Sequence, residues 1–118
     1  MTTDIASEIV GEVAGWPGVT AHPHRFGGTE LRLDGHELGH LHGSRQADLP
    51  FPVRVREELV AAGRAEPHHV LPESGWVTRY IRSAADVAAV IELFRLNYER
   101  LAARREGRGA AEDLEPSP

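Results

Sequence analysis

Two kinds of hydrophobic spacing run along the chain and predict where its helices and strands lie. Near the amino terminus the apolar side chains recur every four positions, at Ile5, Ile9 and Val13. That is the spacing of an amphipathic helix. Because glycine ends helices readily, we expect this first helix to stop near Gly15.

A change to alternation over 29–42 predicts a pair of strands. Leucines alternate with polar residues around Asp34-Gly35, a dipeptide typical of two-residue hairpin turns. The turn sets the expected cross-strand pairs, which are Leu33–His36, Arg32–Glu37, Leu31–Leu38 and Thr29–His40. We therefore predict an antiparallel hairpin in which Glu37 and the histidines point to opposite faces.

The rest of the chain predicts a compact α+β domain. We expect a third strand over 47–51, a helix from Pro52 to Gly63, a loop over 67–75, a strand over 76–82, and a long helix that opens with a Ser83–Asp86 cap. The fold class is thus α+β, a small antiparallel sheet made of the hairpin plus one or two further strands, packed against two or three helices. The single domain spans 1–105, and the polar tail 106–118 is expected to be disordered.

Composition narrows the partners and the compartment. The 118 residues carry 13 basic and 18 acidic side chains, and the net charge of −5 disfavours binding to nucleic acid or to an anionic membrane. Every basic residue is arginine, so no clustered lysines counteract that charge. Because the chain has no cysteine and no long apolar segment, we expect a soluble, cytoplasmic protein. The partner that we expect is a small molecule. The oligomeric state is not indicated.

The segment 36–43, HELGHLHG, matches the HExxH signature of zinc peptidases. That site needs a helix, which places both histidines on one face. Here the segment continues the alternation after a hairpin turn, and a strand would separate His36 from His40 by about 13 Å at about 3.3 Å per residue. We therefore reject the peptidase interpretation.

A strand instead groups other histidines. His40 and His42 are two residues apart and share a face, and His22 and His24 have the same spacing, so the two pairs converge if their segments lie side by side. Neutral imidazoles bind metals, and an imidazole can also act as a general base. The alternative is that these histidines are solvated or hydrogen-bonded structural groups.

Further pocket residues come from the loop and the strand after it. The pair His68-His69 lies in a loop and could form the rim of a pocket, and we select His69 as the pocket residue. The alternative is that this loop only connects a helix to the next strand. Trp76 and Tyr80 share one face of their strand and could form an aromatic wall for a planar ligand, although core packing explains such residues equally well. No metal and no cofactor is predicted.

Several stretches, among them GWPGVTAHPHRFGGTELRL, GHLHG, ADLPFP and AAGRAEPHHVLPESGWV, resemble the luciferase-like domain named after fungal luciferases. The resemblance covers about Trp16 to Leu101 and includes the helix over 90–101. More distantly, the order of elements is similar to that of the small MmcQ/YjbR-like proteins. Both resemblances imply a compact α+β fold.

The luciferase-like resemblance implies an activity as well. It implies oxygen-dependent oxidation of a hydroxylated pyrone or a similar aromatic compound without a metal or a flavin, in which a base removes the hydroxyl proton and donors stabilise the resulting anion. His40 and His42, which lie in GHLHG, are the candidates for base and donor. The YjbR-like alternative is a small-ligand or protein-interaction module without turnover.

Overall fold

The computed structural model describes the backbone of residues 4–107 and the side chains of residues 4–104. Its helices are α1 (Ile5–Ala14), α2 (Val53–Ala61) and α3 (Ala85–Gly107), with a 3₁₀ turn η1 (Arg25–Gly27). Its strands are β1 (Val19–His24), β2 (Gly28–Leu33), β3 (His36–His42), β4 (Gln46–Pro50), β5 (Glu66–Pro67) and β6 (Trp76–Tyr80).

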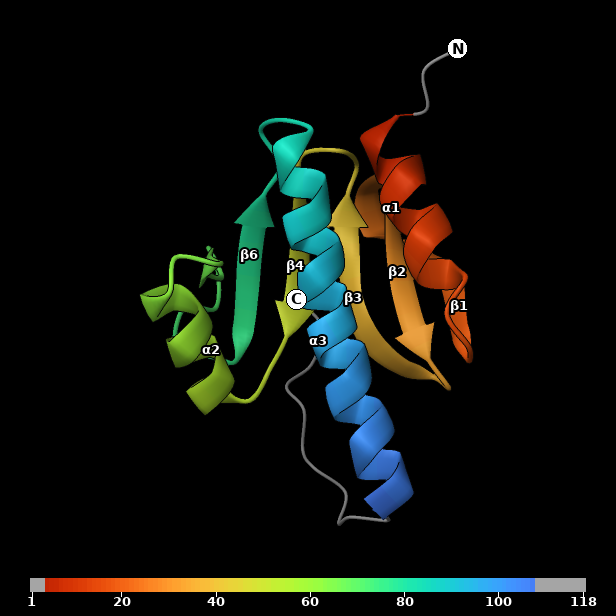
Figure 1. Cartoon of the computed structure of the whole chain (residues 1–118). Coiled ribbons are helices and arrows are strands. Elements are labelled where there is room, and N and C mark those ends of the chain that lie inside the picture. The colour runs from red at the N-terminus through yellow and green to blue at the C-terminus, as the bar shows by residue number, and fades with distance from the viewer. Residues whose placement is uncertain (1–3, 108–118) are drawn as a thin grey trace.

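The strands form one antiparallel sheet in the order β1-β2-β3-β4-β6-β5 (Figure 1). The predicted α+β class is confirmed. The sheet is larger than the hairpin plus one or two strands, because β1 pairs with the hairpin along its whole length and the two-residue β5 joins the other edge. Of the tail predicted over 106–118, residues 108–118 lie outside the described residues, whereas residues 106–107 belong to α3, which runs two residues past the expected domain end.

Helices α1 and α3 lie side by side on one face of the sheet, which we call the helix face (Figure 1). The core forms between them and the strands, with α2 packed beside β5 and β6 at the edge. Its most buried side chains include Ile9, Val13, Leu31, Leu38, Leu49, Val77, Val90 and Phe94. Among the described residues, no helix is both long and apolar enough to cross a membrane.

Local sequence explains where the two covering helices begin. The carboxylate of Asp4 accepts the backbone N–H of Ser7 at 2.9 Å, which caps α1. The carboxylate of Asp86 accepts the backbone N–H groups of Arg82 and Ser83 at 2.7 and 3.0 Å, ahead of α3. The cap predicted from Ser83 and Asp86 is therefore present.

The hairpin forms as predicted at its turn and departs from the prediction beyond it. Asp34 and Gly35 both have positive φ, 51° and 87°, as a type I′ turn requires. The pairs Leu33–His36 and Arg32–Glu37 are confirmed. A β-bulge then shifts the register by one residue, so the predicted pairs Leu31–Leu38 and Thr29–His40 are wrong, and Leu31 faces Gly39 while Thr29 faces Leu41.

Gly39 permits this bulge. Its φ is 155°, and a Cβ there would lie 2.8 Å from the Asp48 carbonyl oxygen and 3.0 Å from Cε1 of Phe94. Beyond the extra residue, the side chains of β3 point to the face opposite the one that regular alternation would give. His36 and His40 therefore point to opposite faces of the sheet, and Glu37 and His40 point to the same face. The prediction that Glu37 faces away from His40 is therefore wrong, whereas the predicted strand, on which the HExxH site cannot form, is confirmed.

Candidate functional site

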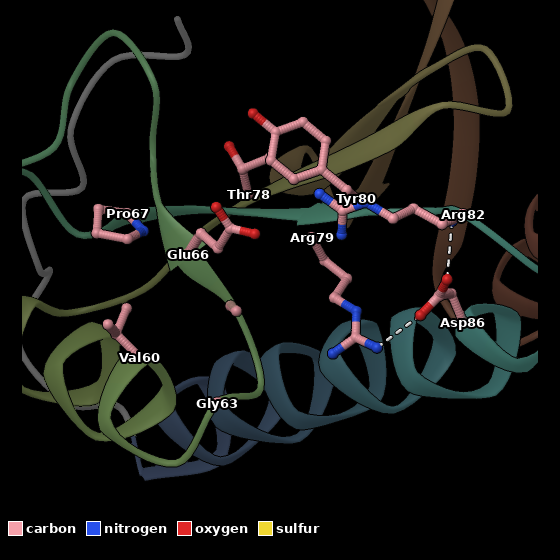
Figure 2. Close-up of a pocket in the computed structure, with 10 residues that line it drawn as sticks. Val60, Gly63, Glu66, Pro67, Thr78, Arg79, Tyr80, Arg82 and Asp86 are labelled. Atoms are coloured by element: carbon pink, nitrogen blue, oxygen red, sulfur yellow. Dashed lines mark hydrogen bonds and ion pairs between the residues drawn. The ribbon is translucent and has the colours of Figure 1, made fainter.

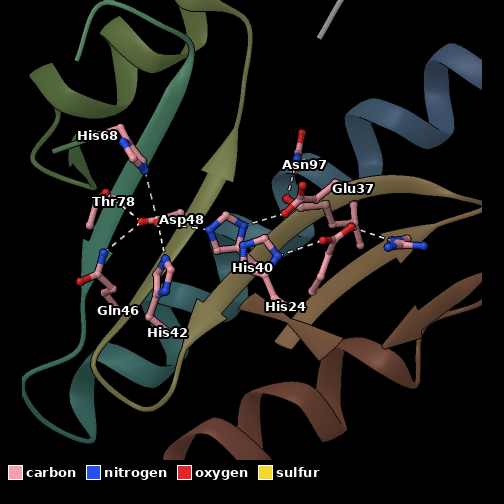
Figure 3. Close-up of polar contacts among 12 residues, drawn as sticks. His24, Glu37, His40, His42, Gln46, Asp48, His68, Thr78 and Asn97 are labelled. Atoms are coloured by element: carbon pink, nitrogen blue, oxygen red, sulfur yellow. Dashed lines mark hydrogen bonds and ion pairs between the residues drawn. The ribbon is translucent and has the colours of Figure 1, made fainter. Parts of the chain in front are cut away.

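The face of β3, β4 and β6 opposite the helix face carries polar side chains that are as buried as the core. We call it the histidine face, and its central residues are His40, His42, Asp48, Thr78 and Trp76. Asp48 is fully buried in β4. Its Oδ1 accepts a hydrogen bond from Thr78 Oγ1 at 2.8 Å and another from Gln46 Nε2 at 3.3 Å (Figure 3). These two donors fix the orientation of the carboxylate.

Three imidazoles converge on the other carboxylate oxygen. Oδ2 of Asp48 lies 3.0 Å from Nε2 of His42, 3.3 Å from Nε2 of His40 and 3.4 Å from Nε2 of His68 (Figure 3). His40 and His42 come from β3, and His68 comes from the loop after β5. The strand order β3-β4-β6 is what places these segments around one carboxylate.

His40 is held between two carboxylates. Its Nδ1 lies 2.7 Å from Oε2 of Glu37, an interaction that depends on the bulge. Burial opposes a charge on His40, but the nearby carboxylates of Asp48 and Glu37 outweigh it and raise the pKa of His40 to about 9. Burial alone would raise the pKa of Asp48, yet the close imidazole of His40 and the hydrogen bond from Thr78 hold it well below the usual range. At neutral pH the two form a buried ion pair.

His24 stacks on His40 and repeats its bonding pattern. The two rings are 3.9 Å apart and nearly parallel. Nδ1 of His24 lies 3.1 Å from Oε1 of Glu30, just as Nδ1 of His40 meets Glu37. Within the described part of the chain, the buried Nε2 atoms of His24, His40 and His68 have no hydrogen-bond partner of good geometry. Unpartnered buried polar atoms are uncommon in proteins, and a cluster of them is the arrangement expected where an ion, a ligand or a water binds.

His68 differs from the others in its tautomer. Its Nδ1 accepts the backbone N–H groups of Val70 and Leu71 at 3.0 and 3.1 Å, so Nδ1 cannot carry a proton. The proton of this imidazole therefore sits on Nε2, which faces Asp48. Burial lowers the pKa of His68, against the opposing charge of Asp48, and keeps it neutral at pH 7.

A cavity of about 210 Å³ opens above this cluster. Its lining comprises Arg25, Phe26, His40, His42, Asp48, His68, His69, Val70 and Leu71. Phe26 and Val70 at its edge are 94% and 64% exposed, which is unusual for large apolar side chains. His42 is partly exposed in the cavity, and burial lowers its pKa although Asp48 acts in the opposite direction. The cavity thus has a charged floor and an apolar rim.

A second cavity, of about 420 Å³, lies at the β5–β6 edge (Figure 2). It contains Tyr80 and Arg82, whose guanidinium stacks on the Tyr80 ring at 5.1 Å. The guanidinium of Arg79 donates a hydrogen bond of 2.8 Å to Oδ1 of Asp86. Because no group of imidazoles faces this space, the first cavity is the stronger candidate site.

The structure brings together most of the residues predicted for the site. His24, His40 and His42 stack or meet edge to edge, and Trp76 lies behind them, 5.4 Å from the His40 ring. His69 lines the cavity mouth and stacks on His68. Two predicted residues lie elsewhere: His22 bonds Thr20 Oγ1 at 2.7 Å on β1, and Tyr80 lines the second cavity.

Sequence reasoning missed Asp48 and left His68 out of the site. His69, which it selected, lines the cavity, but it is His68 that is buried and reaches Asp48. A signal for Asp48 existed, because a charged residue inside the apolar stretch ADLPF is rare unless it is paired. No comparable signal distinguished His68 from His69.

Comparison with protein families gives one match. The model described as Luciferase domain matches residues 35–97, just over half of the 118-residue chain. The match spans β3, β4, the His68 loop and β6, and therefore includes Asp48 and the three imidazoles around it. The searches of curated proteins and of solved structures find no match.

Proposed function

This chain belongs to the luciferase-domain family, and from that premise we propose that it oxidises a small hydroxylated aromatic compound or pyrone with molecular oxygen. The observation that carries the proposal is the cavity above Asp48, which combines a floor of buried imidazoles and carboxylate with an exposed apolar rim. Such a site suits a flat ligand with one polar end.

The size and lining of the cavity define the ligand. Its volume of about 210 Å³ is below the range of about 300–1,000 Å³ typical of drug-sized ligands, so a single-ring molecule fits best. The apolar rim of Phe26 and Val70 would contact the ring. The hydroxyl group would then lie on the floor, against His40 and His42.

The chemistry needs a proton acceptor and a positive centre. Loss of the hydroxyl proton makes the ring an electron-rich anion, which donates an electron pair to O₂ and forms a C–O bond. The balanced step is R–H + O₂ → R–OOH, so both oxygen atoms remain in the product and no external reductant is consumed. The protonated imidazole of His40 would supply the positive centre beside the anion, and the exposed ring of His69 at the cavity mouth would pass the proton to solvent.

Oxygen uptake tests this proposal directly. The protein is incubated with a panel of hydroxylated aromatic compounds and pyrones, and O₂ consumption is recorded with incorporation of label from ¹⁸O₂. We expect one O₂ per ligand and both labelled atoms in the product. His42→Ala should lose turnover, whereas His36→Ala, an exposed histidine on the helix-face side of the same strand, should retain it.

The variant Phe26→Ala tests whether the apolar rim of the cavity binds the ring of the ligand. Because Phe26 is 94% exposed, the free energy of unfolding should change by less than about 0.5 kcal/mol, while KM for the ring compound rises severalfold. Binding of a ring compound without O₂ uptake by the wild type would refute the oxidation. That result would support the ligand-binding module instead.

A further inference from the structure

We propose that the imidazoles of His40 and His42 and the carboxylate of Asp48 bind one divalent first-row transition-metal ion at the floor of the cavity. The inference deepens the proposed function, and it rests on that function only for the role of the ion. The site itself follows from the donor atoms, and the metal-free chemistry implied by the family resemblance does not predict it.

The donor atoms are already spaced as ligands of one ion. Nε2 of His42 and Nε2 of His40 lie 3.0 and 3.3 Å from Oδ2 of Asp48, and all three atoms lie within 4.8 Å of one another. Metal–ligand bonds of about 2.0–2.2 Å separate adjacent ligands by about 2.8–3.6 Å in octahedral or tetrahedral geometry. Both nitrogen–oxygen distances are therefore already those of two ligands on one ion.

Neighbouring groups hold these donors in the orientation that coordination requires. Glu37 accepts the Nδ1 proton of His40, which directs Nε2 of His40 towards Asp48, where it has no well-aligned hydrogen-bond partner in the described structure. A carboxylate bonded to the far nitrogen of a histidine is the usual support of a metal-binding imidazole. Thr78 and Gln46 occupy Oδ1 of Asp48 and leave Oδ2 for the ion.

The tautomer of His68 excludes it from the ligand set. A neutral histidine coordinates through a nitrogen that lacks a proton. Nδ1 of His68 already accepts two backbone N–H groups, so its proton is on Nε2, the nitrogen that faces Asp48 at 3.4 Å. The ion would have two imidazoles and one carboxylate, with its remaining positions open to the cavity. This ligand set is typical of catalytic zinc and non-haem iron.

Charge balance favours a divalent ion at this position. Glu37 and Asp48 supply two negative charges in a site where His40 and Asp48 are fully buried. A divalent ion bound by Asp48 would balance both of these charges, and it would also supply the positive centre that a ligand anion needs.

The test measures metal binding without any ligand. The full chain is purified without a histidine tag, stripped with a chelator, dialysed against Zn²⁺, Co²⁺ or anaerobic Fe²⁺, and examined by elemental analysis and by the visible spectrum of the Co²⁺ form. We expect about one ion per chain in the wild type and in the matched control His36→Ala. His42→Ala and His40→Ala should bind at least about 100-fold more weakly, since even loss of a supporting residue costs 10–100-fold.

Other results of this experiment would contradict the metal site. Retention of well below one ion per chain by the wild type, or equal affinity in His42→Ala, would overturn the site. Loss of the ion in His36→Ala as well would show surface binding only. Because His42 is partly exposed, His42→Ala should fold and keep the wild-type circular dichroism spectrum. If His40→Ala does not fold, the metal affinity of His42→Ala alone decides whether the site exists.

The metal site and the proposed oxidation can fail independently. Full O₂ uptake by chelator-stripped protein would reject a role for the ion in the oxidation and keep the oxidation, while elemental analysis still decides whether the site binds an ion. Stoichiometric binding of the ion, with no O₂ uptake for any ring compound, would keep the site and reject the oxidation.

Discussion

Both faces of the sheet contain fully buried side chains, but the two faces differ in how the polar groups among them are paired. On β4, Leu49 points to the helix face and Asp48 to the histidine face, and both are fully buried. The helix face gains stability from apolar contact with α1 and α3. The histidine face contains carboxylates and imidazoles, and in the described structure the Nε2 atoms of His24, His40 and His68 lack well-aligned partners. Burial alone therefore does not distinguish a core from a site, whereas unsatisfied polar atoms do.

The bulge in β3 is what allows one strand to serve both faces. It turns the backbone at Gly39 towards Phe94 on the helix face and brings Glu37 to the same side as His40. Without the extra residue, regular alternation would place His40 opposite Thr29 on the helix face, away from Glu37. The packing of the core and the support of the site thus depend on the same local irregularity.

The largest effect should come from Phe94→Ala on the helix face. Phe94 is fully buried, so the lost contacts and the remaining cavity should lower the free energy of unfolding by about 3–5 kcal/mol. Urea denaturation measures this loss, with exposed Phe26→Ala as the matched control. If both variants lost the same stability, the contrast between a packed helix face and an exposed rim would be refuted.

A smaller effect is expected from Thr78→Val on the histidine face. The change keeps the shape of the side chain but removes the hydroxyl that donates to Asp48 at 2.8 Å, leaving a buried charged acceptor short of one bond. The cost should be about 1.5–3 kcal/mol of unfolding free energy. The affinity for the proposed ion should also fall by about 10–100-fold.

The matched control for Thr78→Val is Thr20→Val. Thr20 is exposed on β1, so its variant should stay within about 0.5 kcal/mol of the wild type and keep its affinity for the ion. Unchanged affinity in Thr78→Val would show that the orientation of Asp48 does not matter to the site.

The same contrast explains what could be read from the sequence. The hairpin turn at Asp34-Gly35 and the apolar spacing of α1 and α3 depend on residues close together in the chain, and both were predicted correctly. The bulge at Gly39 was not, because one extra residue changes the register without changing the apparent alternation.

The composition of the site was harder to predict for a different reason. The meeting of His24, His40, Asp48 and His68 depends on strand order and on the path of one loop, which local spacing does not encode. Backbone N–H groups of that loop select His68 rather than its neighbour His69. Such a choice is visible only once the chain is folded.

The smallest effect should come from Asp86→Asn, which alters neither face but loosens the attachment of α3 to β6. Asp86 pairs with Arg79 at 2.8 Å and accepts the backbone N–H groups of Arg82 and Ser83, and these interactions lower its pKa. A carboxyl with a lowered folded pKa stabilises the protein above its unfolded pKa, and this contribution is lost as the pH falls through the folded pKa. The melting temperature of the variant should therefore lie below that of the wild type at pH 7, and the gap should narrow towards pH 3. A gap that is independent of pH would mean that the amide itself, rather than the lost charge, disturbs the helix, and the attachment of α3 to the sheet edge would then not be electrostatic.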